Sequence, residues 1–179
     1  KTTKRFENQI IYAGRLSKEK GIDVLLDTAR RLPPEYNLLI AGIGPEEEKV
    51  RNVANSKANV HYLGYQSKQN TISLIRGSDL LIQPSLMEGI SSTLLEAMGC
   101  GTCIIASNVG GNMEIIQNEK NGVLIEPNNV EKMLDKISNL LLENEKRVAM
   151  SAEGLKTAIK YDWKQVGKLY LDIYESIFH

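Results

Sequence analysis

Short apolar runs alternate with longer segments of helical period along most of the chain. The short runs are rich in Ile, Val, Leu and Tyr, and they predict six strands, at residues 9–14, 37–42, 59–64, 79–85, 102–107 and 122–127. The segments between them predict helices near residues 21–32, 45–56, 67–77, 91–100 and 111–118. Such regular alternation is typical of βαβ units, so we expect an α/β fold with a parallel sheet and right-handed crossovers.

Two further helical segments follow the last predicted strand, "VEKMLDKISNLLLENEKRVAM" and "WKQVGKLYLDIYESIF". The second carries a stripe of apolar residues at helical spacing, formed by Val166, Leu169, Tyr170, Ile173, Tyr174 and Ile177. This stripe is long for a terminal helix. The simpler expectation is that the helix, at about residues 162–179, packs on its own domain. The alternative is that it packs on a neighbour absent from this chain.

Composition and charge restrict the classes of function. The 179 residues are 42% hydrophobic, which is enough for one domain with a buried core. Lys plus Arg and Asp plus Glu each number 22, so no net charge attracts nucleic acid, and any anion site must be local. No apolar run reaches the roughly 18 to 20 residues of a membrane-spanning helix, and the first residues lack the apolar stretch of a signal peptide. These features predict a cytoplasmic protein.

The two cysteines, Cys100 and Cys103, lie close together in "CGTC". A redox pair or half of a metal site is one interpretation of this spacing. No second cysteine pair or nearby histidine completes a zinc set, however. We therefore expect two ordinary, mostly buried thiols.

The carboxyl ends of parallel strands are where such sheets bind ligands. After the first predicted strand, in "AGRLSKEKG", Arg15 and Lys20 flank a short loop before a helix. A guanidinium, an ammonium group and the free N–H groups of a helix start together suit a phosphate. A solvated loop is the alternative interpretation, because Lys18 and Glu19 lie in the same run.

The glycines of "AGIGPEEE", after the second predicted strand, suggest a dinucleotide-binding loop. The pattern fails in detail, because Glu47 replaces the last glycine of G-x-G-x-x-G and its acidic neighbours would repel a pyrophosphate. Acidic residues suit the first turn of a helix instead. We expect a structural turn at Gly42 and Gly44, followed by a helix.

The stretch "PSLMEGISSTLLEAMGCG" places Glu88 and Glu96 eight positions apart around the start of a predicted helix. Ser91, Ser92 or Thr93 can cap this helix. Thr93 and Glu96 also fit a capping box, in which the carboxylate reaches back to a backbone N–H group. That interpretation would account for Glu96 but leaves Glu88 unexplained.

A nucleotide-sugar would explain both carboxylates. Its diphosphate would lie at the helix start, where N–H groups bind negative charge, and Gly89 would permit close approach of the backbone. Its ribose and its hexose carry hydroxyl groups, and one carboxylate can accept from both hydroxyls of a vicinal diol. One glutamate beside each sugar, with cations for the phosphates, is therefore a consistent set of partners.

Eight ordered motifs carry a resemblance to a known family. They are Arg15 with Lys20-Gly21, Gly42-x-Gly44-Pro45, "NVHYLGY", "SDLLIQPSLMEG", Glu88-x7-Glu96, "EAMGCGTCIIAS", "GGNMEII" and "NGVLIEP". Together they resemble the C-terminal half of the family 4 retaining glycosyltransferases, the glycosyl transferases group 1 of GT-B fold. The resemblance covers nearly the whole chain and implies a Rossmann-like, three-layer αβα domain, one half of a GT-B enzyme, that binds the donor nucleotide-sugar.

The resemblance also implies roles for individual residues. Arg15 and Lys20 would hold the distal phosphate, Glu96 would accept from the ribose hydroxyls, and Glu88 would contact the transferred sugar. The residues with expected catalytic roles are therefore Glu88, Arg15 and Lys20. Backbone groups around the helix start would meet the sugar and phosphates, and those near Tyr65 and Gln66 would meet the base; the residues at the helix start are Gly89, Ile90, Ser91, Ser92 and Thr93.

Two positions depart from the family pattern. Ser91 stands where the family often has Gly, which leaves the shape of the sugar pocket open. Cys103 stands where Pro is usual, and we interpret this change as structural.

The implied partners follow from the same resemblance. The donor would be a UDP- or GDP-sugar, with no cofactor, and the absence of any D-x-D sequence predicts that no metal holds the diphosphate. The acceptor, a glycan, lipid or small molecule, would bind an N-terminal domain that has no counterpart in this chain, and the parent enzyme would be cytoplasmic or peripheral at the inner face of the membrane. Two alternatives stay open: a non-catalytic module that binds nucleotide-sugars or proteins, and a nucleotide-sugar epimerase of similar fold, which lacks the resemblance.

Overall fold

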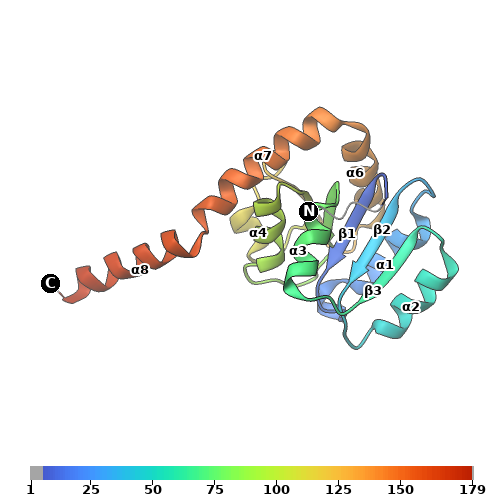
Figure 1. Cartoon of the computed structure of the whole chain (residues 1–179), viewed down its shortest axis with the longest axis horizontal. Helices are drawn as coiled ribbons and strands as arrows, with labels where there is room; N and C mark the ends of the chain where they lie inside the picture. Colours follow the sequence, from blue (N-terminus) through green and yellow to red (C-terminus); the bar gives the residue numbers. More distant parts are fainter. Residues whose placement is uncertain (1–5, 179) are drawn as a thin grey trace.

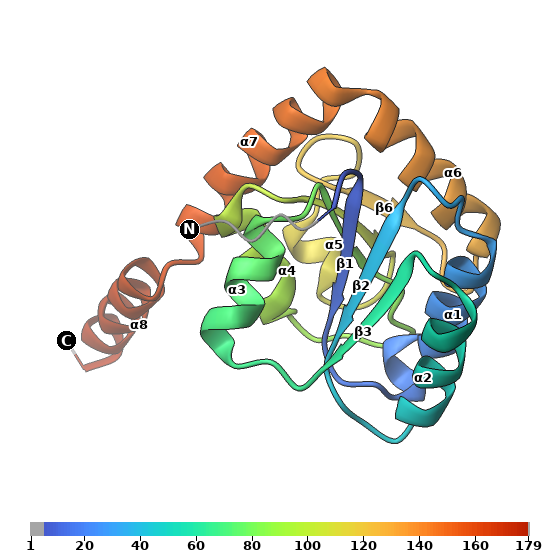
Figure 2. The same cartoon turned by 45° about the vertical axis from the view of Figure 1, so that its right-hand side comes forward.

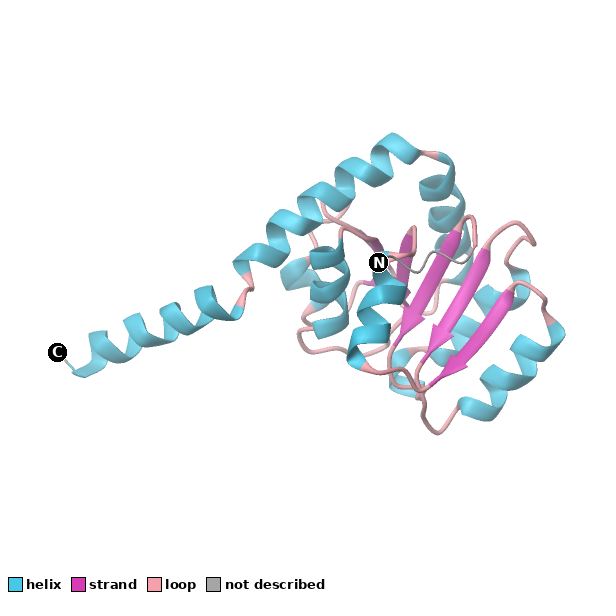
Figure 3. Ribbon diagram, viewed as in Figure 1, coloured by secondary structure: helices cyan, strands magenta, loops and turns pink. Residues whose placement is uncertain are grey.

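A six-stranded parallel sheet forms the centre of the computed structural model, which describes residues 6–178 (Figure 3). The strand order is β3-β2-β1-β4-β5-β6. The strands are β1 (Gln9–Ala13), β2 (Asn37–Ala41), β3 (Val60–Gly64), β4 (Leu80–Gln83), β5 (Cys103–Ser107) and β6 (Val123–Ile125). Each begins and ends within two residues of a predicted strand, which confirms the apolar pattern as the main signal for the sheet.

Helices cover both faces of the sheet and make the three layers of a Rossmann-like fold (Figure 2). The helices on one face are α1 (Ile22–Arg31), α2 (Glu47–Ser56) and α6 (Val130–Leu142). Those on the other face are α3 (Lys68–Arg76), α4 (Ser92–Cys100) and the short α5 (Asn112–Ile115). The long helix α7 (Asn144–Lys160) runs from α6 to α4 and so joins the two outer layers.

The core consists of two apolar clusters, one on each face of the sheet. Alternation along β1 sends Ile10 and Tyr12 toward α1 and α6, and sends Ile11 and Ala13 toward α3 and α4. Both sets are buried, as the nearly continuous apolar runs predict for strands covered on two faces.

The strand order reverses direction at β1. The next strand in sequence, β2, pairs on one side of β1, whereas β4 pairs on the other side, with Ile10 opposite Leu80 and Ile11 opposite Leu81. The loops that follow β1 and β4 therefore leave the same edge of the sheet beside each other. In open α/β sheets this topological switch point is where ligands bind.

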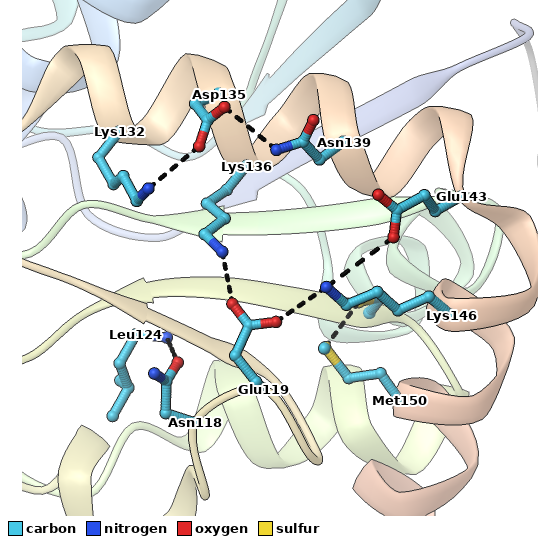
Figure 4. A network of polar contacts seen from close by, with 11 residues as sticks. Asn118, Glu119, Leu124, Lys132, Asp135, Lys136, Asn139, Glu143, Lys146 and Met150 are labelled. Carbon is cyan, nitrogen blue, oxygen red and sulfur yellow. Dashed lines mark hydrogen bonds and ion pairs between the residues drawn. The ribbon is translucent and has the colours of Figure 1, made fainter.

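A loop between α5 and β6 is tied to the last two helices of the domain by one carboxylate (Figure 4). Glu119 accepts from Lys136 of α6 and from Lys146 of α7, the second at 3.0 Å. These two partners hold the pKa of the Glu119 carboxyl below its ordinary value. Nearby, the Cys103 thiol contacts the Met150 sulfur of α7 at 3.5 Å.

Both cysteines are free thiols, as expected. Cys103 is buried, and its burial raises the pKa of the thiol to about 12. Cys100 is half-buried, and burial also raises the pKa of its thiol. None of the helices described between residues 6 and 178 is long and apolar enough to cross a membrane.

The last helix, α8 (Trp163–Phe178), projects away from the domain (Figure 1). The expectation that its apolar stripe packs on its own domain is therefore wrong. Tyr170, Ile173 and Tyr174 are exposed, and Val166, at the start of the helix, is half-buried beside α7. Leu169 and Ile177, which also belong to the predicted stripe, lie outside the residues whose side chains the structure describes.

Candidate functional site

The loops after β1 and β4 are joined by backbone hydrogen bonds. The N–H groups of Leu86 and Met87 donate to the carbonyl oxygen of Glu19, at 2.9 and 3.3 Å. The junction depends on Gly21, which has a φ of 69° and whose missing Cβ would lie 1.8 Å from the carbonyl oxygen of Pro84. A side chain there would force the two loops apart.

This junction brings Lys20 and Glu88 together. Lys20 Nζ donates to Glu88 Oε1 at 2.7 Å, and only 6% of the Glu88 side chain is exposed. The hydroxyl of Ser85 and the side-chain amide of Gln83 donate to the same oxygen. Three donors therefore fix the Glu88 carboxylate from one side.

The loop after β5 closes over the backbone of Glu88. The N–H group of Gly111 donates to the Glu88 carbonyl oxygen at 3.2 Å. Gly110, with a φ of 44°, passes so close that a Cβ would lie 1.9 Å from that same oxygen. Loops from three strands, β1, β4 and β5, thus determine where Glu88 lies.

Helix α4 begins beside Glu88 and is capped by Ser91, whose hydroxyl accepts from the N–H group of Leu94. The capping box considered for Thr93 and Glu96 is not formed. Thr93 lies inside the first turn, and the Glu96 carboxylate instead pairs with Lys68 at the start of α3. Glu96 therefore has no part in capping its own helix.

Two cavities meet at the amino end of α4. The larger, of about 610 Å³, lies between the ends of β1, β2 and β3. Its walls include Glu96, Lys68, Tyr65, Gln66 and the turn from Gly42 to Pro45. The smaller, of about 270 Å³, lies beside β4 and is lined by Lys20, Gln83, Ser85, Glu88, Ile90 and Ser91 among others.

Five residues line both cavities: Ala13, Gly14, Arg15, Ser92 and Thr93. Arg15 is exposed, and its guanidinium makes no hydrogen bond or ion pair with any residue between positions 6 and 178. Ser92 and Thr93 form the first turn of α4, whose N–H groups have no acceptor within the helix. An unpaired cation and a helix amino end therefore form the boundary between the cavities, an arrangement suited to an anion.

The smaller cavity also contains a buried phenol. Tyr12 lines it and donates its hydroxyl to the carbonyl oxygen of Arg15 at 2.7 Å. Burial, with smaller contributions from the charges of Glu88 and Glu19, raises the pKa of Tyr12 above its ordinary value. The phenol therefore stays protonated and holds the backbone that carries Arg15.

All but one of the residues that the sequence predicted for the donor site line one or both of these two cavities. Tyr65 is 73% exposed at the rim of the larger cavity, while the Gln66 side chain turns back to the carbonyl oxygen of Leu63. Ile90 is exposed at the mouth of the smaller cavity. Gly89 is the exception, because it lines neither cavity and a Cβ on it would meet nothing within 4 Å.

The turn after β2 is structural, as predicted, and it also forms a wall of the larger cavity. Gly44 lies against the backbone of Leu16, and Glu47 and Glu48 occupy the first turn of α2. The glycines of this turn therefore allow it to pack closely against the loop after β1.

Comparison with known families identifies the family of the chain. The sequence model of the family described as Glycosyl transferases group 1 matches residues 2–157. The chain belongs to the group 1 glycosyltransferases. This match confirms the resemblance to the family that the sequence motifs indicated, and the six-stranded parallel sheet confirms the predicted α/β fold.

Named relatives of this group 1 domain include transferases of known type. It is 30% identical over 171 residues to the N,N'-diacetylbacillosaminyl-diphospho-undecaprenol alpha-1,3-N-acetylgalactosaminyltransferase of Campylobacter jejuni, a match that covers 94% of this chain and 44% of that protein. The chain spans about half the length of the curated relatives it matches.

Solved structures agree on the fold of this group 1 domain. The structure of Anabaena HepE in complex with UDP-glucose superimposes with a TM-score of 0.82 at 22% identity, covering 96% of this chain and 48% of that one. The C-terminal domain of a group 1 protein, LpcC, from Francisella tularensis superimposes with a TM-score of 0.74 at 26% identity. That match covers 87% of this chain and 86% of the other, so a domain of this type has been crystallised by itself.

Sequence reasoning missed two side chains of the candidate site, Lys68 and Gln83. Lys68 opens α3 and pairs with Glu96 across the larger cavity. Its position just after the end of β3 was the available signal, because all parallel strands end at the same edge. For Gln83 the available signal was its polarity, because it is the only polar residue of the otherwise apolar strand "LLIQ".

Proposed function

We propose that this chain is the donor-binding domain of a retaining glycosyltransferase, which binds a UDP- or GDP-sugar for transfer of the glycosyl group to an acceptor hydroxyl. One observation carries the proposal. The two cavities contain one carboxylate each, Glu96 and Glu88, and they meet at Arg15 and the amino end of α4. A nucleotide-sugar has the same order of groups: a nucleoside, a diphosphate and a hexose.

The larger cavity would take the nucleoside. Glu96, 19% exposed, would accept from the two ribose hydroxyls, and its partner Lys68 is exposed enough to move aside. The ring of Tyr65 and the turn from Gly42 to Pro45 offer apolar and backbone surface to the base. A cavity of this size is within the range in which proteins hold small ligands, about 300 to 1,000 Å³.

The diphosphate would lie at the boundary of the two cavities. Arg15 can hold phosphate oxygens with two parallel hydrogen bonds, and the N–H groups of Ser92 and Thr93 add the partial positive charge of the helix end. Lys20 lies in the wall of the smaller cavity and has three protons to share between Glu88 and a phosphate.

The smaller cavity would take the transferred sugar, with Glu88 accepting from its hydroxyls. In the reaction, the bond between the anomeric carbon and the diphosphate oxygen breaks as the acceptor oxygen forms a new bond on the same face. The acceptor proton passes to the departing phosphate. Arg15, Lys20 and the helix N–H groups would stabilise the negative charge that develops there, which is how preplaced donors accelerate such reactions. The absence of a D-x-D sequence favours a metal-independent mechanism.

The acceptor would bind a second domain of the parent chain, since the relatives are about twice as long. The exposed face of α8, with Tyr170, Ile173 and Tyr174, is the element that we expect to pack on that domain. The proposal places the parent enzyme in the cytoplasm, at the inner face of the membrane where its acceptor is a lipid.

A titration series tests the proposal. The chain is titrated by NMR with UDP-, GDP- and ADP-sugars, beginning with UDP-glucose, and transfer is assayed for the chain and for its full-length parent. We expect binding at about 0.1 to 1 mM without transfer by this chain, because an open half-site neither holds an acceptor nor excludes water. Transfer by this chain alone would overturn the division into two domains. Binding without transfer by the parent would favour a non-catalytic module.

A further inference from the structure

Gln83 is a buried polar residue at the end of a strand that is otherwise apolar. It is 6% exposed, and it follows Leu80, Leu81 and Ile82 in β4. A buried amide costs free energy unless both of its ends are hydrogen-bonded. Both ends are bonded here: Gln83 Nε2 donates to Glu88 Oε1, and Gln83 Oε1 accepts from the Ser91 hydroxyl at 3.1 Å.

The partners fix the direction of every hydrogen bond in this chain of contacts. A carboxylate can only accept, so the amide nitrogen of Gln83 must face Glu88 and its oxygen must face Ser91. The Ser91 hydroxyl then gives its proton to Gln83 and accepts from the N–H group of Leu94, at 3.5 Å. All donors therefore point from the start of α4 toward Glu88.

The chain of contacts fixes one of the two oxygens of Glu88. Glu88 Oε1 accepts hydrogen bonds from Lys20, Gln83 and Ser85, whereas Oε2 accepts none from any residue between positions 6 and 178. A carboxylate held in this way presents its second oxygen to the cavity in one direction. A site that places an acceptor so strictly discriminates by whether a ligand hydroxyl meets it.

We propose that Gln83 is a positioning residue which, together with Ser91, orients Glu88 for the transferred sugar and links that orientation to the start of α4. This inference rests on the proposed function, in which Glu88 contacts the sugar and not the nucleotide. It gives a reason for the serine at position 91, where the family often has glycine: the hydroxyl completes the contacts of Gln83.

The test compares UDP with UDP-sugars, using UDP-glucose, UDP-galactose and UDP-N-acetylglucosamine, for wild type, Glu88→Ala and Gln83→Leu. The UDP-sugar that wild type binds most tightly is the probe. We expect Gln83→Leu to raise the dissociation constant for this UDP-sugar about five- to tenfold, and that for UDP less than about twofold. Retained UDP binding shows that the variant is folded.

Glu88→Ala separates failure of this inference from failure of the proposed function. A loss confined to UDP-sugars in Glu88→Ala, with none in Gln83→Leu, would overturn the positioning role alone. Equal effects of Glu88→Ala on UDP and UDP-sugar would overturn the assignment of Glu88 itself. Equal effects of Gln83→Leu on both ligands would indicate a structural role only.

Two further variants test the link to Ser91 and the direction of the bonds. Ser91→Gly removes the hydroxyl but keeps a residue that caps helices with little loss of stability. The double variant Ser91→Gly with Gln83→Leu should bind the UDP-sugar no more weakly than Gln83→Leu alone. Additive losses of affinity would contradict a single chain of contacts.

Gln83→Glu places two carboxyl groups together, which share one proton at low pH. Its affinity for the UDP-sugar should approach that of wild type at pH 5 and fall below that of Gln83→Leu at pH 8. Equal pH dependence in wild type and Gln83→Glu would overturn the assigned direction.

Discussion

Lys20 and Glu88 are partners, although 68 positions separate them in sequence and we assign them to different parts of the donor. Lys20 Nζ lies 2.7 Å from Glu88 Oε1. On the proposed function, an incoming phosphate would meet Arg15 first, as the cation that makes no ion pair with the described residues, and would share Lys20 with a carboxylate that the protein itself supplies. The opposite charges of Lys20 and Glu88 would offset each other at the sugar end of the site.

The first prediction distinguishes the two carboxylates. Glu96→Ala should weaken the binding of UDP and of UDP-sugar alike, because both ligands contain the ribose. The loss of charge-assisted hydrogen bonds should lower each affinity by about tenfold or more. Glu88→Ala should weaken only the UDP-sugar. Calorimetric titration measures both. Unchanged UDP affinity in Glu96→Ala would exclude its ribose contact, and an accompanying loss of thermal stability would leave Glu96 only the structural role of joining α4 to α3 through Lys68.

The second prediction concerns the cations. Arg15→Ala and Lys20→Met should weaken the binding of UDP far more than the binding of uridine, because the proposed partner of both side chains is phosphate. Lys18→Ala is the matched control, as an exposed lysine of the same loop that lines neither cavity. Equal losses for UDP and uridine would contradict phosphate binding. Lys20→Met also leaves Glu88 without its cation, so its thermal stability is measured beside its affinity.

Sequence alone predicted the sheet well because a strand buried on both faces shows itself directly as a run of apolar residues. It could not predict contacts that exist only after loops from distant strands meet. Lys20 with Glu88, Lys68 with Glu96 and Gln83 with Ser91 are of this kind.

Local rules also left two alternatives that tertiary structure decided. Three consecutive hydroxyl residues could cap α4, and the cap is Ser91 because its hydroxyl reaches the N–H group of Leu94. The apolar stripe of α8 was visible in sequence, but sequence does not show which surface a stripe faces.

The third prediction is that α8 adds little stability to this domain. A chain ending at Asp162 should unfold within about 3 °C of the 179-residue chain, because Tyr170, Leu171 and Tyr174 are exposed and the helix projects from the domain. Thermal unfolding followed by circular dichroism measures this. A larger loss that persists on tenfold dilution would show that the helix packs on its own domain in solution.

The fourth prediction concerns the thiols. Cys103 should resist alkylation in the native chain, because its pKa of about 12 leaves almost no thiolate at pH 8. Cys100 should react first, since it is half-buried rather than buried. Mass spectrometry after timed exposure to iodoacetamide, with a denatured control, measures the order. Earlier modification of Cys103 would show that α7 opens away from β5.

The fifth prediction is a pH-dependent contribution from Glu119. Its pKa is lowered in the folded state by Lys136 and Lys146, so its stabilisation is present above the ordinary value near 4.5 and is lost as pH falls through the folded value. Glu119→Gln should therefore reduce the free energy of unfolding at pH 7 and not at pH 3. Because 38% of the side chain is exposed, we expect less than about 1 kcal/mol.

Glu35→Gln is the matched control for that measurement. Glu35 is an exposed residue of the turn before β2, and its carboxylate makes no ion pair with any residue between positions 6 and 178. Its substitution should leave stability unchanged at both values of pH. A loss in Glu119→Gln that is equally large at pH 3 would show that packing, rather than charge, holds the loop.

In the proposed site, the order of the strands places the side chains after β3 at a margin of the sheet and the carboxylate offered to the sugar near its centre. Tyr65 and Lys68 follow β3, which is one of the two edge strands, whereas Glu88 follows β4, which has a neighbour on each side. Edge strands open more readily than central ones and tolerate more change. On the proposed function, substitutions after β3 would therefore alter the surface offered to the base without changing the strand that carries Glu88.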